Sequence, residues 1–263
     1  MTLMEKLLVP AGMRRVVEDG QDSVAGAVVR AADLGGLGAA ARVAAYGLDS
    51  DLFPFGADPE HVDVIRFDTT PLMKLDVPPR IERPWPTYPL GFLRNAAPVW
   101  QLQLTRVSTG ARFVRIARDG SERELSTYGG AAWGWQRARG YRPPLAVIGP
   151  RARWQGHDLP ASYAEDIEAV ELVWVGDDAP EGFSPARPRV QARVVPVASC
   201  EAVFEVVITG RWRDAAVRVV QQANGSADLL LLEPDLESVN RLGATAHEPD
   251  QFYVVAPSSE ISD

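Results

Sequence analysis

The residues best suited to hold a ligand lie between positions 128 and 142, where aromatic side chains alternate with glycines and are followed by arginines. Small residues let a ligand approach an aromatic face, and guanidinium groups pair with anions. The candidate ligand- or partner-binding residues are Tyr128, Trp133, Trp135, Arg137, Arg139 and Tyr141. Tryptophans in such a stretch are more often core residues that seal a junction between domains, and Trp133 and Trp135 could have either role.

Two carboxylates, Glu122 and Glu124, precede this stretch and are the candidate catalytic residues. An enzyme that binds an anionic or nucleotide-like compound among the tryptophans and arginines could use one of them as a general base. ADP-ribosyltransferase-like enzymes place a strand-borne arginine and an S-T-S run before an E-x-E pair, but here Ser126 and Thr127 follow the glutamates. Alternate residues of a strand also share one face, which is typical of the solvent side of a hairpin. A nucleotide- or NAD-linked transferase or glycohydrolase is therefore the alternative function.

No other group of residues has the spacing of a reactive site. The three histidines, His61, His157 and His247, follow no metal-ligand pattern, and Cys200 is the only cysteine. A serine nucleophile would be expected in a G-x-S-x-G turn, which the sequence lacks. We therefore expect no metal and no cofactor, and a protein that is more readily a binding module than an enzyme.

Charge and hydropathy narrow the class of partner. The formal net charge is −8 and the isoelectric point is near 5.0, which argues against nucleic acid, since phosphate contacts require clustered cations. No apolar run approaches the length of a membrane span, and Leu7 to Val9 is too short for the core of a signal peptide. We expect a cytoplasmic protein with a protein partner, whereas the oligomeric state is left open.

The N-terminal part predicts helices. Val24, Val28 and Ala31 are spaced along one helical face, with Asp22 or Ser23 as N-cap. A second helix is expected from Ala39 to Tyr46, after a glycine-rich turn. A strand is expected from His61 to Phe67, and prolines between Arg83 and Pro89 indicate a stiff connector. Residues 1–90 are therefore predicted as a helical segment that ends in a proline-rich connector.

A β-meander is predicted for residues 91–150. Apolar runs at 99–104, 112–116 and 124–128 read as three strands, and Asp119-Gly120 between two of them is a hairpin signal.

The C-terminal part contains an apparent repeat. Trp154 and Trp212 are 58 positions apart, and at the same offset the apolar run 171–175 aligns with 229–233. The correspondence resumes at an offset of 61, where 194–196 aligns with 255–257. Self-similarity of this length indicates one supersecondary unit used twice. Chance similarity between two Val/Leu-rich hairpins is the alternative.

Each copy is predicted to be a small barrel, the first over residues 151–208 and the second over 209–263. In the second copy the expected parts are strands at 216–221, 229–232 and 252–255, an Asn224-Gly225 turn and a helix at 236–242. A unit of about 55 residues buries little surface alone, so the two copies should pack on each other. The predicted fold class is α+β and predominantly β: a helical N-terminal segment, an antiparallel β-domain and a tandem pair of SH3-like β-barrels. The predicted function is an acidic, non-catalytic protein-binding module of inhibitor or immunity type.

Overall fold

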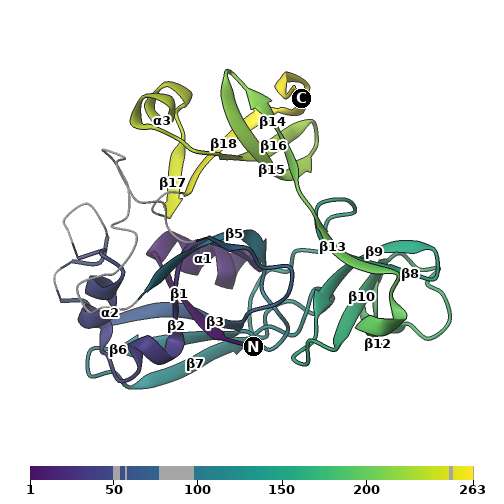
Figure 1. Cartoon of the computed structure of the whole chain (residues 1–263), viewed down its shortest axis with the longest axis horizontal. Coiled ribbons are helices and arrows are strands. Elements are labelled where there is room, and N and C mark those ends of the chain that lie inside the picture. Colours follow the sequence, from purple (N-terminus) through teal and green to yellow (C-terminus); the bar gives the residue numbers. More distant parts are fainter. Residues whose placement is uncertain (50–53, 57, 77–97, 249–250, 263) are drawn as a thin grey trace.

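The chain forms three antiparallel sheets that meet around one junction. The computed structural model describes residues 1–49, 54–56, 58–76, 98–248 and 251–262. The first sheet lies at the lower left of Figure 1, the second at the right and the third at the top. The fold is mostly strand with three short α-helices among the described residues. The α+β, predominantly β class is thus confirmed.

The first sheet has seven strands in the order β4-β5-β2-β1-β3-β6-β7. Their bounds are β1 Leu3–Leu8, β2 Ser23–Arg30, β3 His61–Asp68, β4 Leu75–Asp76, β5 Val99–Arg106, β6 Arg112–Ala117 and β7 Glu122–Thr127. This sheet draws strands from both sides of the boundary expected at residue 90. The strand expected at 61–67 and the meander of three strands beyond residue 98 are confirmed.

Two helices cover this sheet. α1, Pro10–Asp19, begins with a proline at its first position, where the missing N–H costs nothing, and ends at Gly20 in the left-handed region. α2, Ala39–Ala45, matches the second helix expected from the sequence. Its buried Val43 packs with Val62 and Val64 of β3, so the helix contributes directly to the core of the sheet.

The helix expected around Val24 and Val28 is wrong, because Ser23–Arg30 forms strand β2. β2 lies between β1 and β5, and its residues from Val24 to Val29 are all buried. A strand covered on both faces has no alternation of apolar and polar residues, so its valines also fit a helical spacing. Asp22 is therefore not an N-cap. Its carboxylate instead accepts hydrogen bonds from other strands.

The second sheet has six strands in the order β11-β12-β10-β9-β8-β13. Their bounds are β8 Gly149–Trp154, β9 His157–Tyr163, β10 Ala169–Val175, β11 Ser184–Arg187, β12 Val190–Pro196 and β13 Ala202–Val206. A short 3-10 helix, Val197–Ser199, connects β12 with β13.

The third sheet has five strands in the order β14-β15-β16-β18-β17. Their bounds are β14 Ile208–Trp212, β15 Ala215–Ala223, β16 Ser226–Leu231, β17 Thr245–Glu248 and β18 Gln251–Pro257. The expected helix is confirmed as α3, Leu236–Leu242. Its N-terminus is capped by reciprocal hydrogen bonds between Asp235 and Ser238, which form a capping box. A 3-10 helix, Ser258–Glu260, follows β18.

The second and third sheets share a strand order, since β11-β12-β10-β9-β8 corresponds strand by strand to β17-β18-β16-β15-β14. Trp154 and Trp212 each end the first strand of their sheet and are buried. Each is followed by a two-residue turn with positive φ, at Gln155-Gly156 (50° and 75°) and Arg213-Asp214 (47° and 70°). Neither sheet closes among the described residues, so the predicted barrels are open sheets. The duplication itself stays a prediction.

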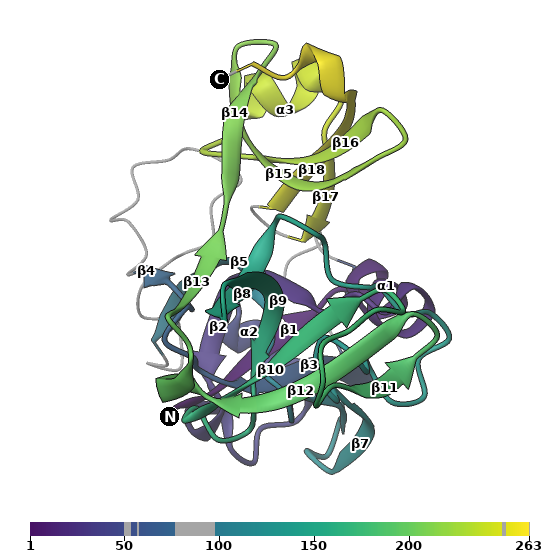
Figure 2. The same cartoon turned by 90° about the vertical axis from the view of Figure 1, so that its right-hand side faces the viewer.

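The two C-terminal sheets have separate cores, which differs from the expected mutual packing. The third sheet instead rests on the first, where Leu230 contacts a cluster with Ala25 and Leu104. The second sheet joins the first through the segment after β7, where the backbone N–H of Ala132 donates to Glu171 at 3.0 Å. Figure 2 shows β13 continuing upward into β14, so one extended run serves both sheets.

Two further expectations concern connectors and membranes. The proline-rich connector between residues 83 and 89 lies outside the described residues. Within the described part of the chain, no helix has the length and apolarity that a membrane crossing demands.

Candidate functional site

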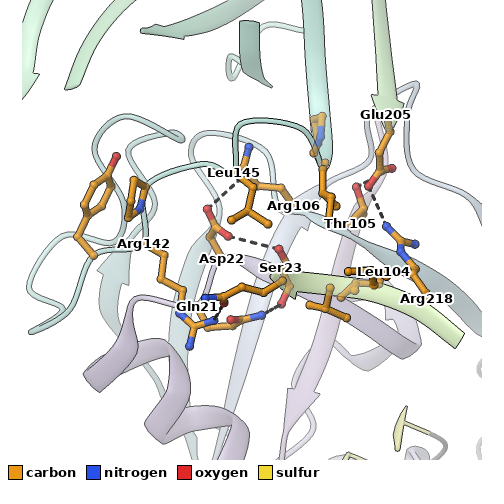
Figure 3. A pocket seen from close by; sticks show the side chains of 18 residues that line it. Gln21, Asp22, Ser23, Leu104, Thr105, Arg106, Arg142, Leu145, Glu205 and Arg218 are labelled. Atoms are coloured by element: carbon orange, nitrogen blue, oxygen red, sulfur yellow. Dashed lines mark hydrogen bonds and ion pairs between the residues drawn. The ribbon is translucent and has the colours of Figure 1, made fainter. Parts of the chain in front are cut away.

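A cavity of about 280 Å³ lies where the three sheets converge. Figure 3 shows it from close by, with side chains from the start of β2, the end of β5, β13 and β15 pointing toward a common space. The loop that leads into β8 closes the remaining side. The lining residues are Gln21, Asp22, Ser23, Leu104, Thr105, Arg106, Tyr141, Arg142, Pro143, Leu145, Ile148, Gly149, Pro150, Glu205, Arg218, Val219, Val220 and Gln221.

One wall carries a buried ion pair between Asp22 and Arg106. The Arg106 Nε donates to Asp22 Oδ2 at 3.0 Å, and the Tyr128 hydroxyl donates to the same oxygen at 2.7 Å. Burial and the adjacent Asp22 carboxylate raise the pKa of Tyr128 well above its usual range, so its hydroxyl keeps its proton. Ser23 also donates to Asp22, at 3.3 Å. The Asp22 carboxylate is therefore fully engaged and balances Arg106.

The opposite wall carries a looser pair, Glu205 of β13 and Arg218 of β15. The Arg218 Nη2 lies 3.3 Å from Glu205 Oε1, and the Thr105 hydroxyl donates to Glu205 Oε2 at 3.2 Å. Burial raises the pKa of Glu205 and lowers the pKa of Arg218, so each charge is only partly compensated by the other. The Arg218 Nε is buried and meets no acceptor among the described residues.

The rest of the lining is apolar with a polar rim. Leu104, Leu145, Ile148 and Val219 supply hydrocarbon surface. At the rim, Arg142 Nη1 donates to Gln221 at 3.4 Å. Small-molecule sites combine an apolar wall with a few fixed polar groups in this way. The arrangement is suited to binding a small polar molecule, and its lining contains neither histidine nor cysteine.

Two of the predicted site residues are core residues. Tyr128 and Trp135 are buried in the core of the first sheet, with their ring centroids 5.3 Å apart. The Trp135 indole N–H donates to the carbonyl of Gln21 at 2.8 Å. Trp135 is 2% exposed, so it lines no opening. Both rings therefore lie inside the core of the first sheet.

The other four predicted residues lie on or near the surface and do not converge. Arg137 and Arg139 are exposed and line no part of the cavity. Tyr141 is half-buried, lines the cavity and donates its hydroxyl to the carbonyl of Ala131 at 3.0 Å. Trp133 is exposed on the far side of the segment. Only Tyr141 therefore belongs to the cavity.

The candidate catalytic carboxylates have different surroundings. Glu122 accepts from Arg66 at 2.6 and 2.5 Å, and the same guanidinium reaches the buried Glu5 at 2.9 Å. The hydrogen bond from Arg66 lowers the pKa of Glu122, which makes it a weaker base. Glu124 is exposed and accepts from the Thr127 hydroxyl at 2.8 Å. Neither lines the cavity.

A second surface feature surrounds Trp133. Its carbonyl accepts from Arg187 Nε at 3.0 Å, and Arg187 also stacks over Tyr141, 4.4 Å from the ring centroid. Burial raises the pKa of Glu171, while hydrogen bonds from the Ala132 backbone and the Trp133 indole oppose the shift. Val194 pairs with Glu171 across the second sheet. Trp133, which contacts the buried Glu171, is 43% exposed, and Val194, the cross-strand partner of Glu171, is 61% exposed.

The cavity could not be recognised from the sequence, because its residues come from five separated segments without a motif. The one signal was the pair Tyr141 and Arg142 near the end of the aromatic stretch. Within the described ranges, no group of His, Cys, Asp and Glu is arranged to hold a metal ion. Comparisons with protein-family models, with curated proteins and with solved structures find no match.

Proposed function

We propose that this chain is an acidic, non-catalytic protein-binding module of inhibitor or immunity type. The supporting observation is the exposed Trp133, held in place by Arg187 at the junction of the first two sheets. Tryptophan is enriched among the residues that dominate binding energy at protein interfaces. A protein of this kind blocks its partner by surface contact and needs no reactive group.

The fixed position of Trp133 favours this function. Its backbone is held by Arg187, and its indole contacts Glu171. A side chain that is already ordered loses less conformational entropy when a partner covers it. The exposed ring is therefore prepared for contact.

The net charge of −8 indicates the kind of partner. A negative surface attracts a basic protein over a distance of about one Debye length and raises its association rate. We expect binding to a basic partner to weaken as salt is added, mainly through slower association.

The finer architecture belongs to the same proposal. We regard the second and third sheets as two copies of one unit, supported by their common strand order and by the matching turns after Trp154 and Trp212. In each copy the fifth strand, β12 or β18, ends at a proline that caps a 3-10 helix, Pro196 or Pro257. Two such units present several independent loops to a partner.

The enzymatic alternative finds less support in the geometry. A transferase or glycohydrolase site around residues 128–142 would need open tryptophan faces near a basic carboxylate, but Trp135 is buried and Glu122 is paired with Arg66. Titration with NAD, followed by calorimetry, tests this alternative directly. Binding that is lost in Arg139→Ala would favour the enzyme.

Affinity capture with matched variants tests the protein-binding function. Wild-type protein should retain a basic protein from extracts of its source, and Trp133→Ala should reduce its retention about tenfold or more, as expected for an interface anchor. The control is Val255→Ser, which alters an apolar side chain 70% exposed on the third sheet and should leave retention unchanged. Equal retention by Trp133→Ala and wild type would refute the role of this surface.

A further inference from the structure

The cavity between the three sheets contains an arginine whose hydrogen-bonding capacity is only partly used. Arg218 is 7% exposed and lines the cavity, and its Nε has no acceptor among the described residues. A buried donor without a partner costs about 1–3 kcal/mol, and more when the group is charged. Such a cost is tolerated where a ligand supplies the missing acceptor.

The balance of charge around the cavity favours an anion. Three guanidinium groups line it, from Arg106, Arg142 and Arg218, against the two carboxylates of Asp22 and Glu205. Asp22 is neutralised by Arg106 and by two hydroxyl donors. Glu205 is only loosely paired with Arg218, at 3.3 Å. The lining therefore carries one guanidinium more than it has carboxylates, and that third guanidinium, Arg142, lies 3.8 Å from the partly exposed Asp19 outside the cavity.

The same carboxylates limit the charge of the ligand. A dianion such as phosphate would face about twice the repulsion from Asp22 and Glu205 that a monoanion meets, so a single negative charge on the ligand is favoured. The planar guanidinium also matches a carboxylate, to which it can donate two parallel hydrogen bonds. A single carboxylate is thus the best match to the polar part of the cavity.

The apolar part of the cavity determines the size and polarity of the rest of the ligand. Leu104, Leu145 and Ile148 provide hydrocarbon surface next to the arginines. The volume of about 280 Å³ lies just below the usual range for drug-sized molecules. It suits a short aliphatic chain or a single ring.

We propose that this junction cavity binds a small organic monocarboxylate, with Arg218 donating to the carboxylate and the apolar wall covering the hydrocarbon portion. The ligand would contact all three sheets at once, because Arg106, Glu205 and Arg218 come from the first, second and third sheet, respectively. This site is separate from the surface around Trp133, so each proposal can fail without the other.

Calorimetry on the full chain tests the assignment. Butyrate and benzoate serve as probes, butyramide as the uncharged match to butyrate, and inorganic phosphate as the competing anion. We expect saturable binding of at least one carboxylate with a Kd below about 1 mM. Butyramide should bind about tenfold more weakly or worse, because it lacks the charge. Tighter binding of phosphate, or no heat from either carboxylate, would overturn the proposal.

Variants localise the binding. Arg218→Gln should weaken carboxylate binding about tenfold or more, the range for one charge-assisted hydrogen bond. Arg189→Gln, which alters an exposed arginine of the second sheet, is the matched control and should bind like wild type. Leu145→Trp places a larger side chain in the cavity from the loop before β8 and should abolish binding. This second variant keeps the test decisive if Arg218→Gln does not fold. Retained binding in Leu145→Trp would place the ligand elsewhere and refute the proposal.

Discussion

Arg66 joins two carboxylates that differ greatly in exposure. Glu5 is fully buried and is also paired with the buried Arg42, whereas the Glu122 side chain is partly open to solvent. Removing one partner from a buried ion pair costs about 3–5 kcal/mol, while exposed pairs are worth about 0–1 kcal/mol. The two ion pairs of Arg66 therefore contribute unequally to the free energy of unfolding.

Glu122→Gln is expected to lower the free energy of unfolding by about 0.5–1 kcal/mol at pH 7, in line with a partly exposed pair. The pKa of Glu122 is lowered in the folded protein by the hydrogen bond from Arg66. A lowered carboxyl pKa contributes stability above its unfolded value, about 4.3, and that contribution is lost as the pH falls through the folded value. The difference between variant and wild type should therefore shrink below about pH 4.

Urea denaturation at pH 7 and at about pH 3.5 measures this effect. Glu5→Gln is the comparison, because it removes a charge at a fully buried position next to the same arginine and should cost about 3 kcal/mol or more. Equal losses of unfolding free energy in Glu122→Gln and Glu5→Gln would contradict the expected difference between a partly exposed and a buried ion pair.

At the scale of elements, the turns of the third sheet follow from the types of their residues. Asn224 and Gly225 have φ of 52° and 79°, the conformation that a two-residue hairpin requires. A Cβ at Gly225 would meet no atom within 4 Å. Any cost of a side chain there must therefore come from the backbone conformation alone.

Gly225→Ala should destabilise the protein by about 1 kcal/mol, because an L-residue is strained in the left-handed region. Gly35→Ala is the matched control. Gly35 has φ of −55°, and its added Cβ would make only an ordinary contact with the carbonyl of Ala32 at 3.5 Å. Thermal denaturation compares the two, and equal losses would show that conformation is not the cause.

The elements that the sequence predicted correctly are those with local signals. The α3 helix has a capping residue at Asp235, and the β6–β7 hairpin has Asp119-Gly120 between alternating runs. β2 was missed because it is buried on both faces and therefore carries no alternation. Of its two neighbours, β1 lies beyond α1 and β5 is distant in sequence, so non-local pairing decides its conformation.

The candidate site was predicted less well than the fold. Trp135 and Trp133 are two residues apart and were assigned one role, yet one is buried and the other exposed. The turn over Gly130 to Gly134 separates them, with a hydrogen bond from Gly134 N–H to the carbonyl of Gly130 at 2.8 Å. The cavity residues Arg106 and Arg218 carry no shared pattern at all, because they meet only when the sheets dock.

At the scale of the molecule, the docking of the third sheet on the first includes a small apolar contact. Leu230 is 6% exposed and packs against Ala25 and Leu104, with Tyr253 at its edge. The core of the third sheet lies on its other face, where Leu229 and Leu231 point. The contact and the core are therefore separable by mutation.

Leu230→Asp should detach the third sheet while leaving its core intact, because the buried charge opposes docking but does not enter that core. Small-angle X-ray scattering should report a larger radius of gyration than for wild type. Val255→Asp, at an exposed position of β18, is the control and should leave the radius unchanged. An unchanged radius in a folded Leu230→Asp protein would show that other contacts hold the sheet.

The extended run of β13 and β14 has a consequence for the cavity that no lining residue reveals. Only Val207 separates Val206 from Ile208, and Thr209 pairs with Arg218, whose guanidinium lies 3.3 Å from Glu205 on the same wall of the cavity. The short backbone connection from Glu205 to Thr209 therefore holds this ion pair together. Lengthening the chain at Val207 would move Glu205 away from Arg218, so the length of this connection sets the geometry of the wall as much as the lining side chains do.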